Sequence, residues 1–352
     1  MHNLQIVKKA LCAGIEVRMK ISILGAGTWG TALTILLSNN GHEVTLWSAL
    51  EKEVTALNTD RRSIPNLPGA VLPDTVAVTS SLEDTFRAPE FVVFAVASPY
   101  VRTTAKQVAS YVKDHMIIVN VGKGIEETTL ETLTDIIEEE IPNADVAVMS
   151  GPSHAEEVSR GIPTTCVVGA KSKKTASLIQ DAFMNDCFRV YTSPDIIGIE
   201  LGGSLKNVIA LAAGIADGLG FGDNTKAALM TRGIAEISRL GIKMGGKLET
   251  FSGLSGVGDL FVTCTSKHSR NRNAGYLIGK GYTMQEAMDE VKQVVEGVYS
   301  AKAALKLAKQ YEVEMPIVEQ INLVLFEDKS AKAAVSDLLL RDKTQENNSL
   351  EW

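Results

Sequence analysis

The sequence predicts an α/β fold in which a doubly wound, mostly parallel N-terminal sheet is followed by an all-α C-terminal domain. Short apolar runs alternate with helical patterns as far as residue 203, which is typical of the βαβ units of a parallel sheet. No strand pattern follows that residue, and the later periodic segments are helical. The two halves of the chain therefore predict different architectures.

The expected strands are short apolar runs bounded by turn residues. They lie at residues 20–24, 43–47, 91–95, 116–121, 146–149, 166–168 and 188–191. Residues 91–96 are apolar throughout, as expected of a strand that is buried on both faces. Helical patterns at residues 99–111 and 129–140 lie between strand runs and favour crossover connections.

A glycine-rich turn follows the first strand run and has the spacing G-x-G-x-x-G. Its first glycine permits a tight turn, its second lets a pyrophosphate approach the backbone, and its third lets helix and strand pack closely. The helical pattern at residues 31–37 would then direct its N-terminus at the phosphates. The turn predicts a Rossmann-type dinucleotide site, and the alternative is an ordinary strand-to-helix turn. The residues concerned are Gly25, Gly27, Thr28, Trp29 and Gly30.

The second half predicts a bundle of helices. Residues 205–219 form a long apolar run, and residues 225–240 read as a further helix. Thr283 and Glu286 have the T-x-x-E spacing of a capping box. We expect an N-terminal extension at 1–18, a dinucleotide-binding domain at 19–203, a helical substrate domain at 204–343 and a flexible tail at 344–352.

Composition excludes several functions for this chain of 352 residues. A net charge of −7 gives no general attraction to nucleic acid or to an anionic membrane. Four cysteines without a C-x-x-C pair indicate reduced thiols and a cytoplasmic protein, and five scattered histidines indicate no metal site. No apolar run looks long enough to insert into a membrane. Residues 1–18 resemble a signal peptide only superficially, and Met19 is an alternative natural start.

Two glycine-rich and polar segments stand where strands should end, which is where open α/β sheets bind ligands. The first is Val121-Gly122-Lys123-Gly124, and the second is Ser150-Gly151-Pro152-Ser153-His154-Ala155-Glu156. Ser153 and Glu156 also have the spacing of a helix cap. The alternative for each segment is a loop with a cap, without a bound ligand.

The segment Gly202-Gly203-Ser204-Leu205-Lys206-Asn207 stands at the expected start of the first long helix. With Ser204 as N-cap, Lys206 lies in the first turn, where the helix dipole opposes a positive charge. Burial would also disfavour the charged form, and both effects lower the pKa towards that of a general base. The alternative is an exposed helical lysine.

A fourth segment, residues 253–260, contains Asp259 and is followed by Ser269-Arg270-Asn271-Arg272-Asn273. Arginine with neighbouring hydroxyl and amide donors suits a phosphate group. The alternative is a solvated basic loop.

Taken in order, these segments resemble the NAD(P)-dependent glycerol-3-phosphate dehydrogenases. The likeness covers roughly residues 19–326. It rests on Gly25-Ala26-Gly27-Thr28-Trp29-Gly30, Asn66-Leu67-Pro68-Gly69, Val121-Gly122-Lys123-Gly124, Ser150-Gly151-Pro152-Ser153-His154-Ala155, Leu205-Lys206-Asn207, Gly256-Val257-Gly258-Asp259-Leu260, Ser269-Arg270-Asn271 and Val294-Val295-Glu296-Gly297.

The resemblance implies reversible hydride transfer between sn-glycerol 3-phosphate and dihydroxyacetone phosphate, with reduction supplying glycerol 3-phosphate for phospholipids. It implies that Lys206 is the proton acceptor, and we expect Asp259 to orient it. The implied substrate-binding residues are Lys123, Gly151, Ser153, Lys206, Asp259, Ser269, Arg270 and Asn271. The implied cofactor-binding residues, beyond the glycine turn, are Lys123, Gly151, Ser153, Ala155, Arg270, Val294 and Glu296. Because the motifs come from both halves, we expect the active site in the cleft between the domains.

The cofactor is expected to be NADP or NAD. An acidic residue about 20 positions after the glycine turn would favour NAD, and a nearby arginine would favour NADP. The second strand ends at Trp47-Ser48-Ala49 without either, Glu51 comes slightly late, and Arg61 and Arg62 are too far along to place. The missing acid favours NADP or the use of both.

Two other functions stay open at this point. One is a related two-domain dehydrogenase of hydroxy acids or sugar acids, which would need a carboxylate site in place of the phosphate site. The other is a non-catalytic NAD(P)-binding sensor, which would not need Lys206 with Asp259. A homodimer is compatible with all three functions.

Overall fold

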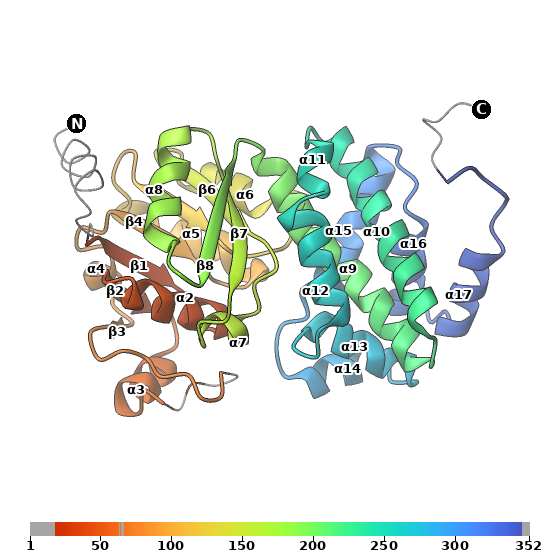
Figure 1. Cartoon of the computed structure of the whole chain (residues 1–352), viewed down its shortest axis with the longest axis horizontal. Coiled ribbons are helices and arrows are strands. Elements are labelled where there is room, and N and C mark those ends of the chain that lie inside the picture. Colours follow the sequence, from red (N-terminus) through yellow and green to blue (C-terminus); the bar gives the residue numbers. More distant parts are fainter. Residues whose placement is uncertain (1–17, 63, 65–66, 347–352) are drawn as a thin grey trace.

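The computed structural model describes residues 18–62, 64 and 67–346. One sheet of eight strands has the order β3-β2-β1-β4-β5-β6-β7-β8, and only the β6–β7 pair is antiparallel (Figure 1). The strands are β1 Lys20–Leu24, β2 Glu43–Trp47, β3 Ala77–Thr79, β4 Phe91–Phe94, β5 Ile117–Asn120, β6 Asp145–Ser150, β7 Thr164–Ala170 and β8 Phe188–Ser193. The strand order reverses between β1 and β4, which makes their carboxyl ends the expected ligand position.

The sheet confirms every strand expected from an apolar run and adds β3. That strand has only three residues, one exposed and two half-buried, so it carries no apolar run to detect. It pairs with β2 at the edge of the sheet. Backbone pairing with a neighbour, and not its own sequence, defines it.

Helices cover both faces of the sheet. They are α2 Thr28–Asn39, α3 Glu51–Thr59, α4 Leu82–Thr85, α5 Val101–Val108, α6 Leu133–Glu140, α7 Ala155–Val158 and α8 Lys173–Phe183. Side chains of α2 and α8 join one buried apolar cluster, which includes Leu33 and Phe183. Side chains of α5 and α6 join another, which includes Val101 and Ile137. The sheet is therefore buried on both sides, as the apolar β4 run predicts.

Every element that the structure describes after β8 is a helix. They are α9 Ile196–Gly218, α10 Asp223–Lys243, α11 Leu248–Phe251, the π-helical turn Leu254–Gly258, α12 Asp259–Thr265, α13 Arg270–Gly279, α14 Met284–Val291, α15 Glu296–Gln310, α16 Pro316–Phe326 and α17 Ala331–Leu339. Helix α9 lies at the centre and packs against α10, α12, α13 and α15 (Figure 1). The Thr283–Glu286 capping box is present at the start of α14, as predicted.

The start of α9 differs from the prediction. The helix begins at Ile196, and the Asp195 carboxylate caps it by accepting from the Gly198 amide at 3.0 Å. Ser204 is therefore inside the helix and not its N-cap. The Gly202-Gly203 pair serves close packing, because a Cβ on Gly202 would lie 2.7 Å from the Ser255 carbonyl oxygen. A glycine pair that looks like a helix boundary in sequence is here a contact surface.

Two further expectations were wrong. Helix α9 is long and apolar enough to cross a membrane, but 89% of its most apolar window is buried inside the protein. Its length comes from its place as the central helix of the bundle. The Ser153–Glu156 spacing does not form a cap, because α7 begins after His154 and the Ser153 hydroxyl donates to the Gly151 carbonyl instead, at 3.0 Å.

Candidate active site

The glycine turn lies at the carboxyl end of β1 and leads directly into α2. Gly25 has a φ of +112° and donates its amide to the Trp47 carbonyl at 2.9 Å, which seats the turn against β2. A Cβ on Gly30 would lie 2.0 Å from the Gly25 carbonyl oxygen, so only glycine fits there. Gly27 provides no side-chain cap for α2, and Thr28 and Trp29 form its first turn. The open helix N-terminus suits a pyrophosphate.

One carboxylate joins the two halves of the molecule. Asp259 is 1% exposed and begins α12, directly after the π-helical turn. Its Oδ1 lies 2.8 Å from Lys206 Nζ on α9, and its Oδ2 lies 2.7 Å from Lys123 Nζ on the loop after β5. Lys123 also donates to the Gly151 carbonyl at 3.1 Å. Four of the predicted site residues therefore meet at one point.

The environment of Lys206 lowers its pKa to about 8. Burial is the largest cause, and the Lys123 ammonium lowers the pKa further. The Asp259 carboxylate acts in the opposite direction because it stabilises the charged amine. The helix dipole makes no contribution of the kind predicted, since Lys206 lies inside α9. Burial, with a smaller contribution from Lys123, therefore lowers the pKa of Lys206 towards that of a general base.

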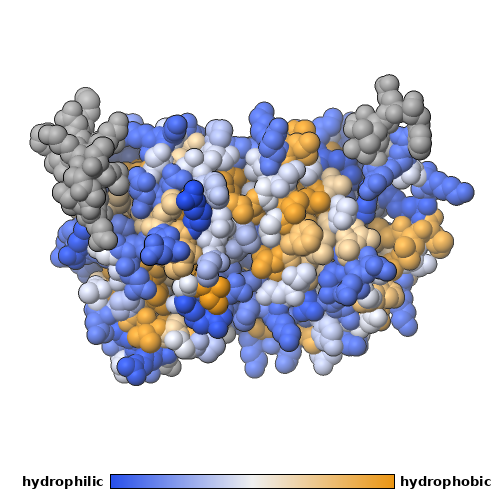
Figure 2. Space-filling model, in the orientation of Figure 1, coloured by the Kyte–Doolittle hydropathy of each residue, from blue (hydrophilic) through white to orange (hydrophobic). Residues whose placement is uncertain are grey.

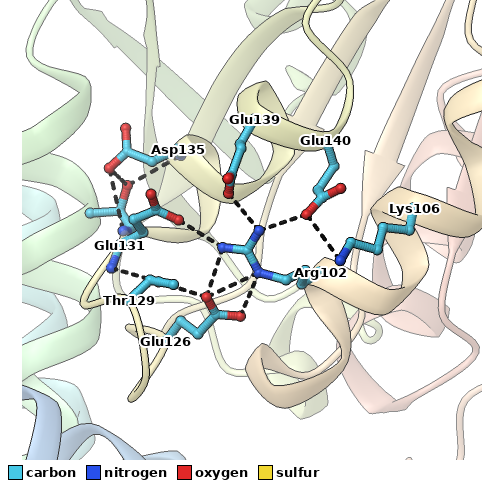
Figure 3. A network of polar contacts seen from close by, with 9 residues as sticks. Arg102, Lys106, Glu126, Thr129, Glu131, Asp135, Glu139 and Glu140 are labelled. Atoms are coloured by element: carbon cyan, nitrogen blue, oxygen red, sulfur yellow. Dashed lines mark hydrogen bonds and ion pairs between the residues drawn. The ribbon is translucent and has the colours of Figure 1, made fainter.

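Arg102 anchors the loop that carries Lys123 (Figure 3). Its guanidinium binds Glu126 and Glu131 of this loop, both at 2.7 Å, and also two carboxylates of α6. The loop also reaches the helical half, because Ile125 is part of the buried helical cluster and Glu127 lies 3.8 Å from Lys306 on α15. The loop therefore connects the sheet to the helices while it positions Lys123.

A second polar contact connects the halves at Glu296. This buried residue begins α15 and accepts hydrogen bonds from the Ser98 amide at 3.3 Å and from the Ser98 hydroxyl. Burial raises the pKa of Glu296, while these hydrogen bonds and the charge of Arg270 lower it. Val294 lies two residues before it and is half-buried. The predicted cofactor residues of this segment therefore stand beside the end of β4.

The three predicted phosphate-binding residues lie at the start of α13. Ser269 caps the helix by accepting from the Arg272 amide at 3.2 Å, and the Asn271 side-chain oxygen accepts from the Gly297 amide at 2.8 Å. Arg270 is exposed and lines a cleft of about 530 Å³ between the halves. The other cleft residues include Leu67, Pro68, Arg160, Lys267 and His268. Arg270 thus lines the cleft, whereas Lys206 and Asp259 are not among the cleft residues.

His154 belongs to the segment at residues 150–156, but its residue type and position predict no role for it. Its Nε2 is buried and has no hydrogen-bond partner among the described residues. Burial, followed by the charge of Lys206, lowers its pKa to about 4, so the ring is neutral at physiological pH. Its ring lies 5.8 Å from that of His268, which lines the cleft. In the sequence, only its position between Ser153 and Ala155, two predicted cofactor-binding residues, indicates that His154 lies near the site. Ala155 itself is buried in the first turn of α7.

Comparison with known proteins agrees with this geometry. The family model described as the NAD-dependent glycerol-3-phosphate dehydrogenase N-terminus matches residues 20–176, and the model of the C-terminus matches residues 195–336. Among similar proteins, the glycerol-3-phosphate dehydrogenase [NAD(P)+] of Agathobacter rectalis is 62% identical over 95% of this chain and 99% of its own length. The enzyme of that name from Fusobacterium nucleatum is 58% identical over 94% of this chain and 99% of its own length.

A solved structure is similar over nearly the whole chain. The crystal structure of glycerol-3-phosphate dehydrogenase from Coxiella burnetii has a TM-score of 0.89 and 35% identity. It covers 92% of this chain and 99% of its own. Both family models, the relatives and this structure agree, and the chain belongs to the NAD-dependent glycerol-3-phosphate dehydrogenase family.

Proposed function

We propose that this protein is an NAD(P)-dependent oxidoreductase that interconverts sn-glycerol 3-phosphate and dihydroxyacetone phosphate. The observation that carries the proposal is the Lys206–Asp259–Lys123 contact, which holds a buried amine of lowered pKa where the helical half meets the loop after β5. The names of relatives that cover the whole chain support the same reaction. A sensor would have no use for this amine, and the family membership disfavours the hydroxy-acid alternative.

In this mechanism Lys206 moves the proton and Asp259 holds the amine in place. Neutral Lys206 takes the proton from the C2 hydroxyl of glycerol 3-phosphate while the C2–H bond breaks, and protonated Lys206 returns it in the reverse direction. NAD(P) supplies the hydride acceptor or donor when it is bound. The C2 hydrogen leaves with its electron pair as a hydride, which oxidised NAD(P) would accept, so no oxidant other than this co-substrate is needed. Lys123 adds positive charge beside the same carboxylate.

The other residue roles are part of the proposal. The glycine turn, Thr28 and Trp29 would hold the pyrophosphate at the start of α2. Lys123, Gly151, Ser153, Ala155, Arg270, Val294 and Glu296 would contact the cofactor, and Lys123, Gly151, Ser153, Lys206, Asp259, Ser269, Arg270 and Asn271 the substrate. Asn271 and Ser269 already bond to neighbouring backbone amides, so their side chains would act partly by shaping the Arg270 helix.

The pH dependence of the two directions should differ in sign. Oxidation needs neutral Lys206, so kcat/KM for glycerol 3-phosphate should rise with pH and level off above about 8. Reduction needs the protonated amine, so kcat/KM for dihydroxyacetone phosphate should fall as the pH passes that value. Initial rates measured in both directions over the same buffers test this. Parallel profiles in the two directions would contradict the role of Lys206.

Replacement of Arg270 by alanine should weaken the binding of phosphorylated ligands. Each lost charge-assisted hydrogen bond is worth roughly 1.5–3 kcal/mol, so KM for dihydroxyacetone phosphate should rise about 10-fold or more. Discrimination against unphosphorylated dihydroxyacetone should fall. Lys280→Ala, on an exposed lysine at the other end of α13, is the control. An unchanged KM in Arg270→Ala would contradict the phosphate role, and part of the loss is expected through the cofactor.

A substrate panel tests the proposed reaction against its nearest alternative. We expect oxidation of glycerol 3-phosphate with NAD(P) and no comparable rate with 2- or 3-hydroxy acids. Preference for a hydroxy acid would favour the alternative dehydrogenase. Nucleotide binding without turnover of any alcohol in the panel would favour the sensor.

The remaining expectations are also proposals. We place the domain boundary at the start of α9, because a boundary at residue 203 would divide this helix.

A homodimer is supported by exposed apolar side chains on the helical half, including Leu339 and Leu340 at 80% exposure. Figure 2 shows apolar patches over that half. A cytoplasmic location without membrane insertion is supported by the burial of α9 and by the free thiols of Cys166, Cys187 and Cys264. Cys12 lies outside the described residues.

A further inference from the structure

The carboxyl end of β2 lies directly beside the glycine turn. The Trp47 carbonyl accepts the Gly25 amide at 2.9 Å, and the next residue, Ser48, donates its amide to the Thr79 carbonyl at the end of β3. The short segment from Ser48 to α3 therefore runs along the sheet edge next to the pyrophosphate position. In folds of this kind the residues after the second strand contact the adenosine ribose and distinguish its 2′-hydroxyl from a 2′-phosphate.

Two carboxylates are held at this edge by strand-end hydroxyls. Ser48, which is 3% exposed, donates its hydroxyl to Glu53 Oε2 at 2.6 Å. Ser80 donates its hydroxyl to Glu51 Oε2 at 2.5 Å. Both glutamates lie in the first turn of α3. The Ser48 and Ser80 hydroxyl hydrogens are thus donated to carboxylates and are not available to a phosphate.

The positive groups near this edge do not outweigh the two carboxylates. The N-terminus of α3 contributes about half a unit charge. Lys52 stands between the glutamates in sequence and is exposed, as Glu51 is, so its single charge offsets at most one of the two carboxylates. The Arg61 guanidinium donates to the carbonyls of Pro73 and Val76, both at 3.0 Å, which occupies it elsewhere. The fixed charge at the ends of β2 and β3 is therefore negative.

We propose that Glu51 and Glu53, held by Ser80 and Ser48, make this protein select NAD over NADP. A 2′-phosphate at this edge would meet two carboxylates to which the Ser48 and Ser80 hydroxyls are already donated, whereas a ribose 2′-hydroxyl can donate to a carboxylate. This inference rests on the proposed function for the identity of the cofactor class. It reverses the expectation from sequence, in which Glu51 came slightly late and the missing acid favoured NADP or the use of both. In the structure Ser80 after β3 holds Glu51, and Ser48 after β2 holds Glu53.

The test is equilibrium binding of NADH and of NADPH to the full chain without substrate, followed by nucleotide fluorescence. The wild type should bind NADH at least about 10-fold more tightly than NADPH, and this ratio should shrink as salt screens the repulsion. Glu51→Gln/Glu53→Gln should tighten NADPH binding by roughly 10-fold and leave NADH binding within a few-fold. Glu249→Gln/Glu319→Gln is the matched control, because these exposed glutamates lie in first turns of α11 and α16 and change the net charge equally.

The outcomes separate this inference from the proposed function. Equal or tighter binding of NADPH by the wild type would overturn the inference and leave the proposed reaction intact. Loss of NADPH binding in Lys52→Gln would also overturn it, because it would show that Lys52 binds the 2′-phosphate. An equal gain of NADPH binding in the control variant would reduce the effect to net charge and overturn the role of Glu51 and Glu53. Binding of neither nucleotide would contradict both the inference and the proposed function.

Discussion

A Lys206→Ala variant is expected to lose about 10²–10⁴-fold in kcat while it binds NADH within a few-fold of the parent. The amine is the group that is buried, held by Asp259 at 2.8 Å, and lowered in pKa to about 8. Its removal should not unfold the protein, because Asp259 keeps its contact with Lys123 at 2.7 Å. Steady-state rates and nucleotide titration on the same preparation separate the two effects.

Two controls sharpen this prediction. Lys302→Ala, at a half-buried position of α15, should keep the parental kcat because its side chain contacts only Glu127 and the Phe326 ring among the interactions that the structure describes, and neither belongs to the Lys206 site. Small primary amines added to Lys206→Ala should restore part of the rate, which a purely structural defect would not allow. A kcat within a few-fold of the parent would remove Lys206 from the proton-transfer step.

Replacement of Asp259 by alanine should cost both stability and activity. The change leaves the buried Lys206 and the adjoining Lys123 without their shared carboxylate. Breaking a buried ion pair by removing one partner costs about 3–5 kcal/mol, and here two contacts are lost together. Denaturant unfolding measures the loss of stability. Asp337→Ala, which breaks the partly exposed contact with Lys329, is the control and should cost about 1 kcal/mol or less.

The Asp259→Asn variant tests whether this residue acts on Lys206 or only supports the fold. The carboxylate raises the pKa of Lys206 against the effect of burial. Its neutralisation should lower that pKa further, so the rise in oxidation rate should move to lower pH. A structural role alone would reduce the rate without moving the profile. An unshifted profile would contradict the coupling of the two groups.

The sequence was most predictive where local pattern decides structure. Apolar runs located all strands but β3, and the glycine spacing identified the turn at Gly25, because the backbone geometry there depends on a few adjacent residues. It was least predictive where packing decides. Gly202 and Gly203 look like a helix boundary, yet α9 continues through them because Ser255 and Ser150 pack against the helix.

At the site, too, local motifs predicted some features and tertiary packing determined the others. Lys206, Asp259 and Lys123 were each named from their motifs, and the structure brings all three together. The contacts of Arg102 with four glutamates and of Ser98 with Glu296 join distant segments through side chains alone, so no spacing in the sequence marks them. His154 was quoted but not assigned, since nothing in sequence shows that its Nε2 lacks a partner.

The most direct test of the central claim is to follow the transferred hydrogen. The protein is incubated with dihydroxyacetone phosphate and NADH that carries deuterium at both C4 positions, and the product is examined by NMR. The account predicts one sn-glycerol 3-phosphate for each NADH oxidised, with the deuterium at C2 and the hydroxyl proton taken from solvent through Lys206. Oxidation of NADH without a C2-deuterated product, or no oxidation by protein that binds the nucleotide, would contradict it.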